Sequence, residues 1–162
     1  VDHQRTVAGE AVGDLRVRAA RLRGIVVPPA LVADMIDEFP GLFVAAALAE
    51  GTTTIGGAAE LRVKESDRIA GMAAGLRALG AGIEETADGA RIAGGSLHGG
   101  EVHSHGDHRV AMSFAVAGLC ASGPVAIRDC ANVATSFPGF VQLANAHGFA
   151  LAECPGTLSP PL

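Results

Sequence analysis

The sequence contains no tryptophan and no tyrosine, and aromatic residues make up only 4% of its 162 residues. The core must therefore be built from small and aliphatic side chains, which suits helices and sheets that pack closely together. The cysteines Cys120, Cys130 and Cys154 are odd in number, widely spaced and without a CxxC pair. Disulfide frameworks use paired cysteines, so we expect a reduced, cytoplasmic protein.

Long hydrophobic runs and an excess of positive charge are also missing. The longest apolar runs, near residues 42–49 and 110–121, are shorter than the roughly 20 residues that a membrane-spanning helix needs. A net charge of −5 gives no overall attraction for nucleic acid or for an acidic membrane. We therefore expect neither partner, and any anion site must be local. The chain begins at Val1 rather than at methionine, which indicates a fragment or a processed product.

What the sequence does contain predicts one folded α/β domain. Hydrophobic residues make up 49% of the chain, which is enough for a real core. Period-two patterns and turn residues predict strands over residues 15–19, 24–29, 52–55, 83–85, 90–93, 101–105, 125–129 and 149–151. Helical spacing predicts helices over residues 41–49, 69–79, 110–121 and 136–147. Residues 1–14 suggest no particular element, and we expect a domain over 1–152 and a frayed tail over 153–162.

Two of the predicted helices are apolar on every side. These are the helices over 41–49 and 110–121, and both should be buried all round. Cys120 would then belong to the core rather than act as a nucleophile. Residues 45–64 and 117–136 also repeat one pattern of apolar helix, glycine, strand and polar cluster, offset by about seventy residues. We expect a pseudo-symmetric arrangement of two α/β units.

Polar clusters lie at four predicted helix starts, over residues 37–38, 64–68, 107–109 and 135–136. A helix start favours anions because its N–H groups are unpaired and its dipole end is positive. If the repeat brings these starts together, Arg68 and Arg109 can each bind an anion with two hydrogen bonds, and Lys64 adds a point charge. Asp37 and Glu65 would then be carboxylates held near cations, suited to proton transfer. Taken singly, these residues could equally be helix caps or exposed ion pairs.

Three histidines form an HxHxxH pattern, which raises the question of a zinc site. His103, His105 and His108 span the change from a predicted strand to a predicted helix, so they do not share one face of a regular element. We therefore expect no metal site.

The charged segment resembles the signature of a known enzyme family. Residues 61–68 read Leu-Arg-Val-Lys-Glu-Ser-Asp-Arg, which is similar to the Arg-Val-Lys-Glu-Ser/Thr-Asp-Arg signature of 5-enolpyruvylshikimate-3-phosphate synthase (3-phosphoshikimate 1-carboxyvinyltransferase). The resemblance continues through residues 36–40, 50–54, 107–114 and 134–138. It covers roughly residues 7–151 and corresponds to the C-terminal part of a much longer enzyme.

The resemblance implies a fold and an activity. Family members have two domains of βαβαββ units with helices inside and sheets outside. They transfer the enolpyruvyl group of phosphoenolpyruvate to the 5-hydroxyl of shikimate 3-phosphate, releasing phosphate, in aromatic amino acid biosynthesis. They use no metal and no organic cofactor. The missing N-terminal portion would carry the other half of the active site, so the chain alone should show little or no turnover.

The resemblance also implies roles for individual residues. Asp37 would be the base for the 5-hydroxyl and a shikimate contact, and Lys64 would contact the hydroxyl side of shikimate phosphate. Glu65 would move a proton to and from the methylene carbon through a tetrahedral intermediate. The residues Arg68 and Arg109 would hold phosphoenolpyruvate, with His108 supporting the site.

The sequence departs from part of the family at two positions. Glu60 stands where some members have asparagine, and Thr135 stands where some have lysine. Together with Glu38 and Ser66, these residues resemble the glyphosate-tolerant bacterial branch, so neither contact is transferred and sensitivity to glyphosate is left open. Two alternatives are a UDP-N-acetylglucosamine enolpyruvyl transferase, which shares the fold, and a non-catalytic module completed by a partner.

Overall fold

The computed structural model describes residues 1–154 of the chain. Strands and helices alternate along it, in the order β1 (Asp2–Val7), β2 (Glu10–Asp14), α1 (Phe39–Ala47), β3 (Thr52–Ile55), α2 (Arg68–Ala78), β4 (Gly82–Thr86), β5 (Gly89–Ala93), β6 (Gly100–His103), α3 (His108–Gly118), β7 (Val125–Arg128), α4 (Ala131–Ser136) and α5 (Phe140–Ala146). Three short 3-10 helices add Pro29–Leu31, Ile36–Glu38 and Ala59–Val63. The expected tail over 153–162 lies almost wholly outside the described residues.

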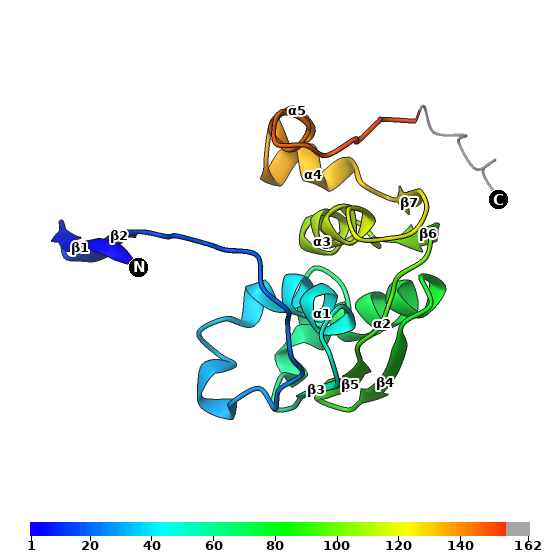
Figure 1. The fold of residues 1–162 in the computed structure, drawn as a ribbon, viewed down its shortest axis with the longest axis horizontal. Coiled ribbons are helices and arrows are strands. Elements are labelled where there is room, and N and C mark those ends of the chain that lie inside the picture. The colour runs from blue at the N-terminus through cyan, green and yellow to red at the C-terminus, as the bar shows by residue number, and fades with distance from the viewer. Residues whose placement is uncertain (155–162) are drawn as a thin grey trace.

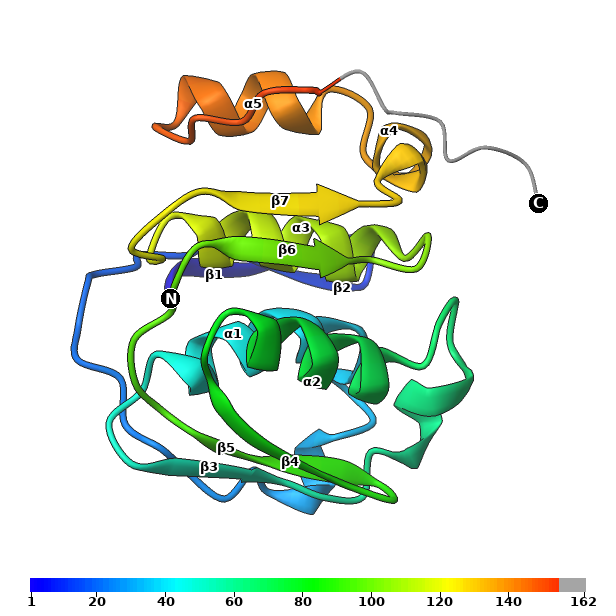
Figure 2. The same ribbon diagram turned by 90° about the vertical axis from the view of Figure 1, so that its right-hand side faces the viewer.

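The helices α1, α2 and α3 lie inside and the strands outside, as the family resemblance implies. An antiparallel sheet of order β3-β5-β4 covers α1 and α2 on one side, and the parallel pair β6-β7 covers α2 and α3 on another (Figures 1 and 2). The largest buried side chains of the core are aliphatic, apart from three phenylalanines, Phe39, Phe43 and Phe114. The absence of tryptophan and tyrosine thus gives a core of closely spaced helices.

The predicted repeat takes the form of two successions in which a helix connects two parallel extended segments. The strand predicted over 24–29 is not formed, because this segment pairs only through an isolated bridge at Val26 and Pro29 begins a 3-10 helix. Residues 22–27 run parallel to β3, with α1 between them, through a bridge from Val26 to Thr54 and a hydrogen bond of 2.8 Å from Gly24 N to Glu50 O. In the same way β6 runs parallel to β7, with α3 between them. Gly24 is required here, because a Cβ would lie 2.3 Å from the carbonyl oxygen of Thr52.

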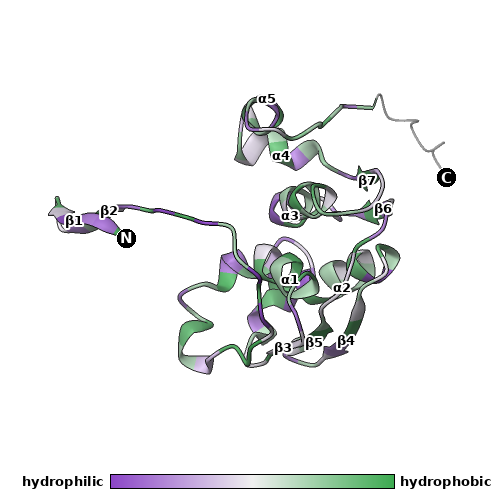
Figure 3. Ribbon diagram, in the orientation of Figure 1, coloured by the Kyte–Doolittle hydropathy of each residue, from purple (hydrophilic) through white to green (hydrophobic). Residues whose placement is uncertain are grey.

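Residues 1–14, for which the sequence predicts no element, form an antiparallel hairpin of β1 and β2. It projects away from the helices at the end of an extended segment (Figure 1), and all of its residues except Val12 are exposed. Hydrophilic residues lie along it (Figure 3). The strand predicted over 15–19 is wrong, because that extended segment has no neighbouring strand to pair with.

The C-terminal part of the prediction is also wrong in two places. The single helix over 136–147 is two helices, because Pro138 disfavours helical geometry before it and Gly139 takes a left-handed φ of 83°. The strand over 149–151 is absent from the described residues. Asn145 explains this, since its side-chain amide donates to Leu151 O at 2.9 Å and accepts from Leu151 N at 2.8 Å, which satisfies the backbone without a neighbouring strand.

The prediction for Cys120 is wrong as well. The helix α3 ends at Gly118, three residues earlier than expected, and Cys120 lies exposed in the turn that follows. Val116 is 45% exposed, so α3 is not buried on every side. Among the residues that the structure describes, no helix is long and apolar enough to cross a bilayer.

Candidate active site

Three of the four polar clusters that the sequence predicts meet in the structure. The 3-10 helix Ile36–Glu38 leads into α1, residues 64–68 lead into α2, and residues 107–109 begin α3. Because α1 packs on both α2 and α3, the three helix starts lie together. The fourth cluster is misplaced, since Thr135 and Ser136 end α4 instead of beginning a helix. No hydrogen bond within residues 1–154 joins either side chain to the other three clusters.

Arg68 is the centre of this arrangement. Its side chain is only 1% exposed, and it donates to three carboxylates: Nε to Asp107 Oδ2 at 2.8 Å, Nη1 to Asp37 Oδ1 at 2.8 Å, and Nη2 to Glu65 Oε2 at 2.6 Å. A buried cation is costly unless its charge and its donors are matched. The three carboxylates provide that match, and they come from three different segments of the chain.

Asp107 is the most deeply buried of these carboxylates, with no exposed side-chain surface. It caps α3, because its Oδ1 accepts from Arg109 N at 2.9 Å and from Val110 N at 3.2 Å. Burial alone would raise the pKa of Asp107, but the hydrogen bonds from Arg68 and from the helix amides outweigh burial and lower it. Asp107 therefore remains ionised and joins a helix start to the buried guanidinium.

Asp37 lies between two arginines and is partly open to solvent. The hydrogen bond from Arg68 lowers its pKa; burial opposes this, and the charges of Arg109 and Lys64 add to the lowering. Arg109 also donates to the backbone oxygen of Asp37 and to Glu38 Oε1, both at 3.0 Å. The pair of arginines thus keeps Asp37 ionised and fixes its backbone.

Lys64 and Ser66, from the segment before α2, also make contacts in this region. Lys64 forms an ion pair with Glu60, one helical turn earlier, and Ser66 donates from Oγ to Asp107 Oδ2 at 3.2 Å. Asp67 caps α2 by accepting from Ala70 N at 2.9 Å. Residues 60–67 are therefore fixed by an ion pair within the segment and by hydrogen bonds to the starts of α2 and α3.

The structure places His108 at the first position of α3, where it is half-buried. Its ring makes no hydrogen bond to another described residue. His103 lies near Glu101 and Asp129 instead, with ring-to-carboxylate distances of 3.7 and 3.6 Å. Within residues 1–154 no group of three histidine, cysteine or acidic side chains is arranged to hold a metal ion.

The sequence analysis did not identify the ion pairs that Asp107, Glu38 and Glu60 form in the cluster. It treated Asp107 by itself as a helix cap, but the same carboxylate also pairs with Arg68. Glu38 and Glu60 each neutralise a cation of the cluster. A signal was present, because each acidic residue lies next to, or one turn from, a predicted site residue. The pairing partner could not be identified without the fold.

The cluster can exchange partners with an incoming anion. Every cation in it already has a carboxylate partner, and a hollow opens beside Asp37 and Arg109. Its other lining residues are Glu38, Gly41, Met112, Ser113, Val116 and Phe140. A phosphate or carboxylate ligand would take over guanidinium donors and release protein carboxylates for proton transfer.

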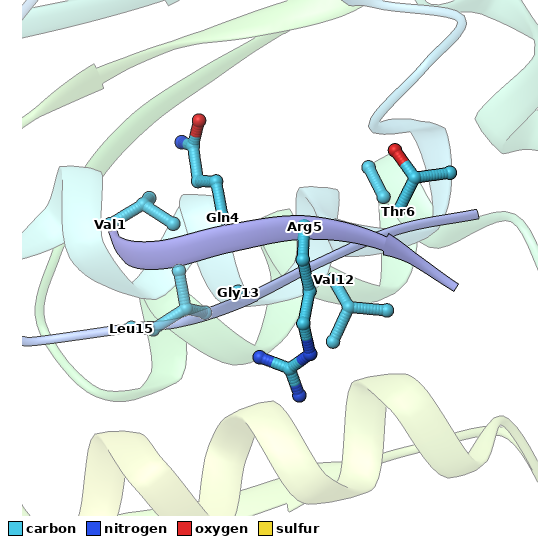
Figure 4. A pocket seen from close by; sticks show the side chains of 8 residues that line it. Val1, Gln4, Arg5, Thr6, Val12, Gly13 and Leu15 are labelled. Atoms are coloured by element: carbon cyan, nitrogen blue, oxygen red, sulfur yellow. The ribbon is translucent and has the colours of Figure 1, made fainter. Parts of the chain in front are cut away.

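A second hollow lies on the β1–β2 hairpin, among side chains that include Gln4, Arg5 and Val12 (Figure 4). It contains no carboxylate and no residue of the Arg68 cluster. The hairpin is exposed on all sides, so this hollow is a feature of the projecting hairpin and not part of the candidate site.

Comparison with known sequences agrees with this arrangement of residues. The sequence model of the family described as EPSP synthase (3-phosphoshikimate 1-carboxyvinyltransferase) matches residues 2–143. The chain belongs to the EPSP synthase family. The matched range includes residues 61–68, the segment that carries Arg68 and its partner Glu65. The inside-out α/β fold is confirmed.

Curated relatives of the EPSP synthase family are similar over nearly the whole chain. A protein of Xanthomonas campestris named 3-phosphoshikimate 1-carboxyvinyltransferase is 62% identical over 95% of this chain, which spans 35% of that relative. One of the same name from Nitrosococcus oceani is 65% identical over 90% of this chain and 33% of the relative. The chain therefore spans about a third of the length of the curated relatives it matches.

Solved structures agree with these relatives. An EPSP synthase of Acinetobacter baumannii is similar with a TM-score of 0.89 and 49% identity, covering 92% of this chain and 36% of that structure. A second structure of the enzyme from the same organism has a TM-score of 0.87. The comparisons favour the EPSP synthase family over a UDP-N-acetylglucosamine enolpyruvyl transferase, an alternative that the sequence left open.

Proposed function

We propose that this chain is part of a longer enzyme that transfers the enolpyruvyl group of phosphoenolpyruvate to the 5-hydroxyl of shikimate 3-phosphate. Phosphate is the other product, and the reaction serves aromatic amino acid biosynthesis in the cytoplasm. The observation that carries the proposal is the buried Arg68 of residues 61–68, which is joined to Asp37, Glu65 and Asp107. The names of the relatives support the same activity.

The reaction requires two kinds of proton transfer, and the cluster offers two partly exposed carboxylates. Asp37 accepts the proton of the 5-hydroxyl as its oxygen attacks the enol carbon of phosphoenolpyruvate. Glu65 delivers a proton to the methylene carbon, which gives a tetrahedral intermediate. Loss of phosphate and return of that proton then restore the double bond. Both carboxylates bind the same guanidinium, so they lie on one side of the proposed reaction centre.

The low pKa of Asp37 makes it a weak base until an anion binds. The hydrogen bond from Arg68 is the largest cause of that low pKa, with burial opposing it and the charge of Arg109 adding to it. When phosphoenolpyruvate takes the donors of these two arginines, the carboxylate loses this stabilisation and its pKa rises. A base is most effective when its pKa approaches the working pH. Substrate binding would therefore activate Asp37.

The other proposed contacts follow the charges of the two substrates. Arg68 and Arg109 bind the phosphate and carboxylate of phosphoenolpyruvate, and Lys64 contacts shikimate 3-phosphate on its hydroxyl side. His108 supports the site from the first turn of α3. The remaining contacts come from the N-terminal portion of the enzyme, which is the partner that this chain requires. No metal or organic cofactor takes part in the proposed reaction.

Phosphate release provides the test of this proposal. The chain is joined to the N-terminal portion of the Xanthomonas campestris relative, and phosphate release from phosphoenolpyruvate is measured with and without shikimate 3-phosphate. We expect turnover that depends on both substrates. Removing the proton-transfer groups by Asp37→Asn or Glu65→Gln should lower kcat by about 10²–10⁴-fold.

The variant Glu101→Gln is the matched control, because it removes a carboxylate that pairs with Arg128 outside the cluster. It should leave kcat unchanged. If the joined protein folds but releases no phosphate, the proposed activity is wrong. If Asp37→Asn and Glu65→Gln behave like the control, the two proton-transfer roles are wrong.

A further inference from the structure

Arg62 connects the candidate site to the tip of the β4–β5 hairpin. Its guanidinium donates from Nε to Ala87 O at 2.8 Å and from Nη2 to Thr86 O at 2.5 Å. The third nitrogen, Nη1, donates to Asp67 Oδ2 at 2.8 Å. The other oxygen of Asp67 caps α2 through Ala70 N. One side chain therefore joins the hairpin tip to the helix cap that directly precedes Arg68.

Asp88, at the same hairpin tip, holds the other end of this segment. Its carboxylate accepts from Gly57 N at 2.7 Å, and its backbone oxygen accepts from Ala58 N at 2.8 Å. The hydrogen bond from Gly57 lowers the pKa of Asp88, and Thr86 Oγ1 adds a further hydrogen bond. The hairpin tip thus binds the chain just before the 3-10 helix Ala59–Val63, and through Arg62 it also reaches Asp67 after that helix.

The segment between these two attachments needs external support. The 3-10 helix Ala59–Val63 has no side-chain cap, and residues 64–66 form no regular element. Lys64 and Glu65 lie in this irregular stretch, so their positions depend on what holds its ends. A reacting group that is misplaced by about 1 Å can lose roughly a hundredfold in rate.

We propose that Arg62, held by the β4–β5 hairpin tip, is a positioning residue for the Lys64–Arg68 segment. It acts through Asp67 and the start of α2 and touches no reacting atom. The kinetic part of this inference rests on the proposed function. The structural part does not, because it concerns the order of the segment in the chain itself.

Arg77 provides a matched control. It also lies between α2 and the hairpin, donating from Nε to Ile83 O at 3.2 Å and from Nη1 to Glu85 Oε1 at 3.0 Å. These contacts are at the opposite end of α2 from Asp67. Arg62→Gln and Arg77→Gln therefore each remove one positive charge and a hydrogen bond to the backbone of the hairpin. Only the first removes the hydrogen bond to Asp67 at the start of the helix.

The first measurement is residue-resolved amide hydrogen exchange by NMR on the 162-residue chain. We expect Arg62→Gln to speed exchange at the Ala70 amide by about tenfold, because Asp67 loses the donor that orients it. Asp88→Ala, which detaches the hairpin tip from the other side, should speed exchange at Gly57 and Ala58. Arg77→Gln should leave all three amides unchanged. Equal exchange at Ala70 in Arg62→Gln and in the original chain would overturn the proposal.

The second measurement is steady-state phosphate release by the chain joined to its N-terminal portion. Arg62→Gln should lower kcat by about tenfold, because it shifts the proton-transfer group Glu65. The KM for phosphoenolpyruvate should stay within about twofold, because Arg68 keeps its hydrogen bonds to Asp37 and Asp107. Arg62→Lys keeps one donor and should recover part of kcat. A fall in kcat no larger than that of Arg77→Gln, at matched thermal stability, would overturn the proposal.

The two measurements separate this inference from the proposed function. If the unmodified joined protein folds but releases no phosphate, the proposed function fails and the exchange at Ala70 alone decides the positioning role. Faster exchange in Arg62→Gln then supports the role, and unchanged exchange refutes it.

Discussion

The guanidinium of Arg68 is held where solvent cannot reach it, and its three carboxylate partners replace the water that it has lost. Asp107 is as deeply buried as Arg68, whereas Asp37 and Glu65 are about half exposed, at 48% and 52%. The buried pair is therefore structural in character, and the two open carboxylates are available to a substrate. The guanidinium of Arg68 thus stabilises the fold through Asp107, and it binds the two carboxylates of the proposed reaction, Asp37 and Glu65.

Asp107→Asn should destabilise the chain by about 3 kcal/mol at pH 7, because it leaves a buried guanidinium with less compensating charge. The folded-state pKa of Asp107 is lowered, so its contribution is fully present above the ordinary aspartate value of 3.8 and is lost as the pH falls through the folded value. Urea unfolding at pH 7 and at about pH 2.5 checks this prediction. If Asp107→Asn lowers the free energy of unfolding by the same amount at both pH values, the prediction is wrong.

Glu60→Gln should increase the affinity of the chain for inorganic phosphate. In the structure, Lys64 forms an ion pair with Glu60. A surface ion pair of this kind contributes about 0.5–1 kcal/mol, so its loss corresponds to roughly a twofold to fivefold gain in affinity. Titration followed by NMR at low ionic strength provides the measurement. Glu101→Gln makes the same change in net charge outside the cluster, so an equal gain in that variant would indicate a general charge effect.

At the scale of elements, the site depends on how closely α2 and α3 approach each other. A Cβ added at Gly75 of α2 would lie 2.2 Å from Cζ of Phe114 in α3, so no larger residue fits between the helices. The sequence pattern predicted both helices, but it could not show that Gly75 faces Phe114. Close packing here fixes Arg68 and Asp107, which lie at the starts of the same two helices.

Gly75→Ala should therefore destabilise the chain by about 1–3 kcal/mol, because overpacking outweighs the gain in helix propensity. Gly71→Ala is a control in the same helix, where the nearest atom to an added Cβ is 3.6 Å away. That variant should be neutral or stabilising by up to about 1 kcal/mol. Thermal unfolding followed by circular dichroism measures both, and equal behaviour of the two would refute the packing argument.

At the scale of the whole molecule, the chain provides only part of the proposed active site, namely the cluster around Arg68. It spans about a third of the length of its relatives. Its first succession of elements runs from residues 22–27 through α1, β3 and α2 to the β4–β5 hairpin, and the second extends through β6, α3 and β7 to two further helices. The hairpin of β1 and β2 projects from this body. The cluster around Arg68 is therefore open on the side of Asp37 and Arg109.

The isolated chain should show little or no turnover with phosphoenolpyruvate and shikimate 3-phosphate, because the substrates would lack the contacts of the N-terminal portion. Adding that portion as a separate polypeptide should restore phosphate release. Coupled phosphate detection, with circular dichroism to show that the chain is folded, checks both statements. Robust turnover by the chain alone would contradict the proposed division of the active site.

The sequence by itself determined the family, the inside-out α/β class and the main helices and strands, because the signature and the apolar patterns are local. It also identified Asp37, Glu65, Arg68 and Arg109 as candidates from their places at helix starts. It misplaced Ser136, since a proline that can begin a helix can also end one, and the neighbouring Gly139 decided the outcome.

Only the tertiary structure decided which charges pair. Asp37 and Asp107 lie 31 and 39 residues from Arg68 along the chain, yet each carboxylate lies 2.8 Å from the guanidinium of Arg68. Local sequence can place a charge at a helix start, but burial and partner depend on how helices pack. The same reason explains why Arg62 passed unnoticed, because its partners at the hairpin tip lie 24 and 25 residues away in the sequence.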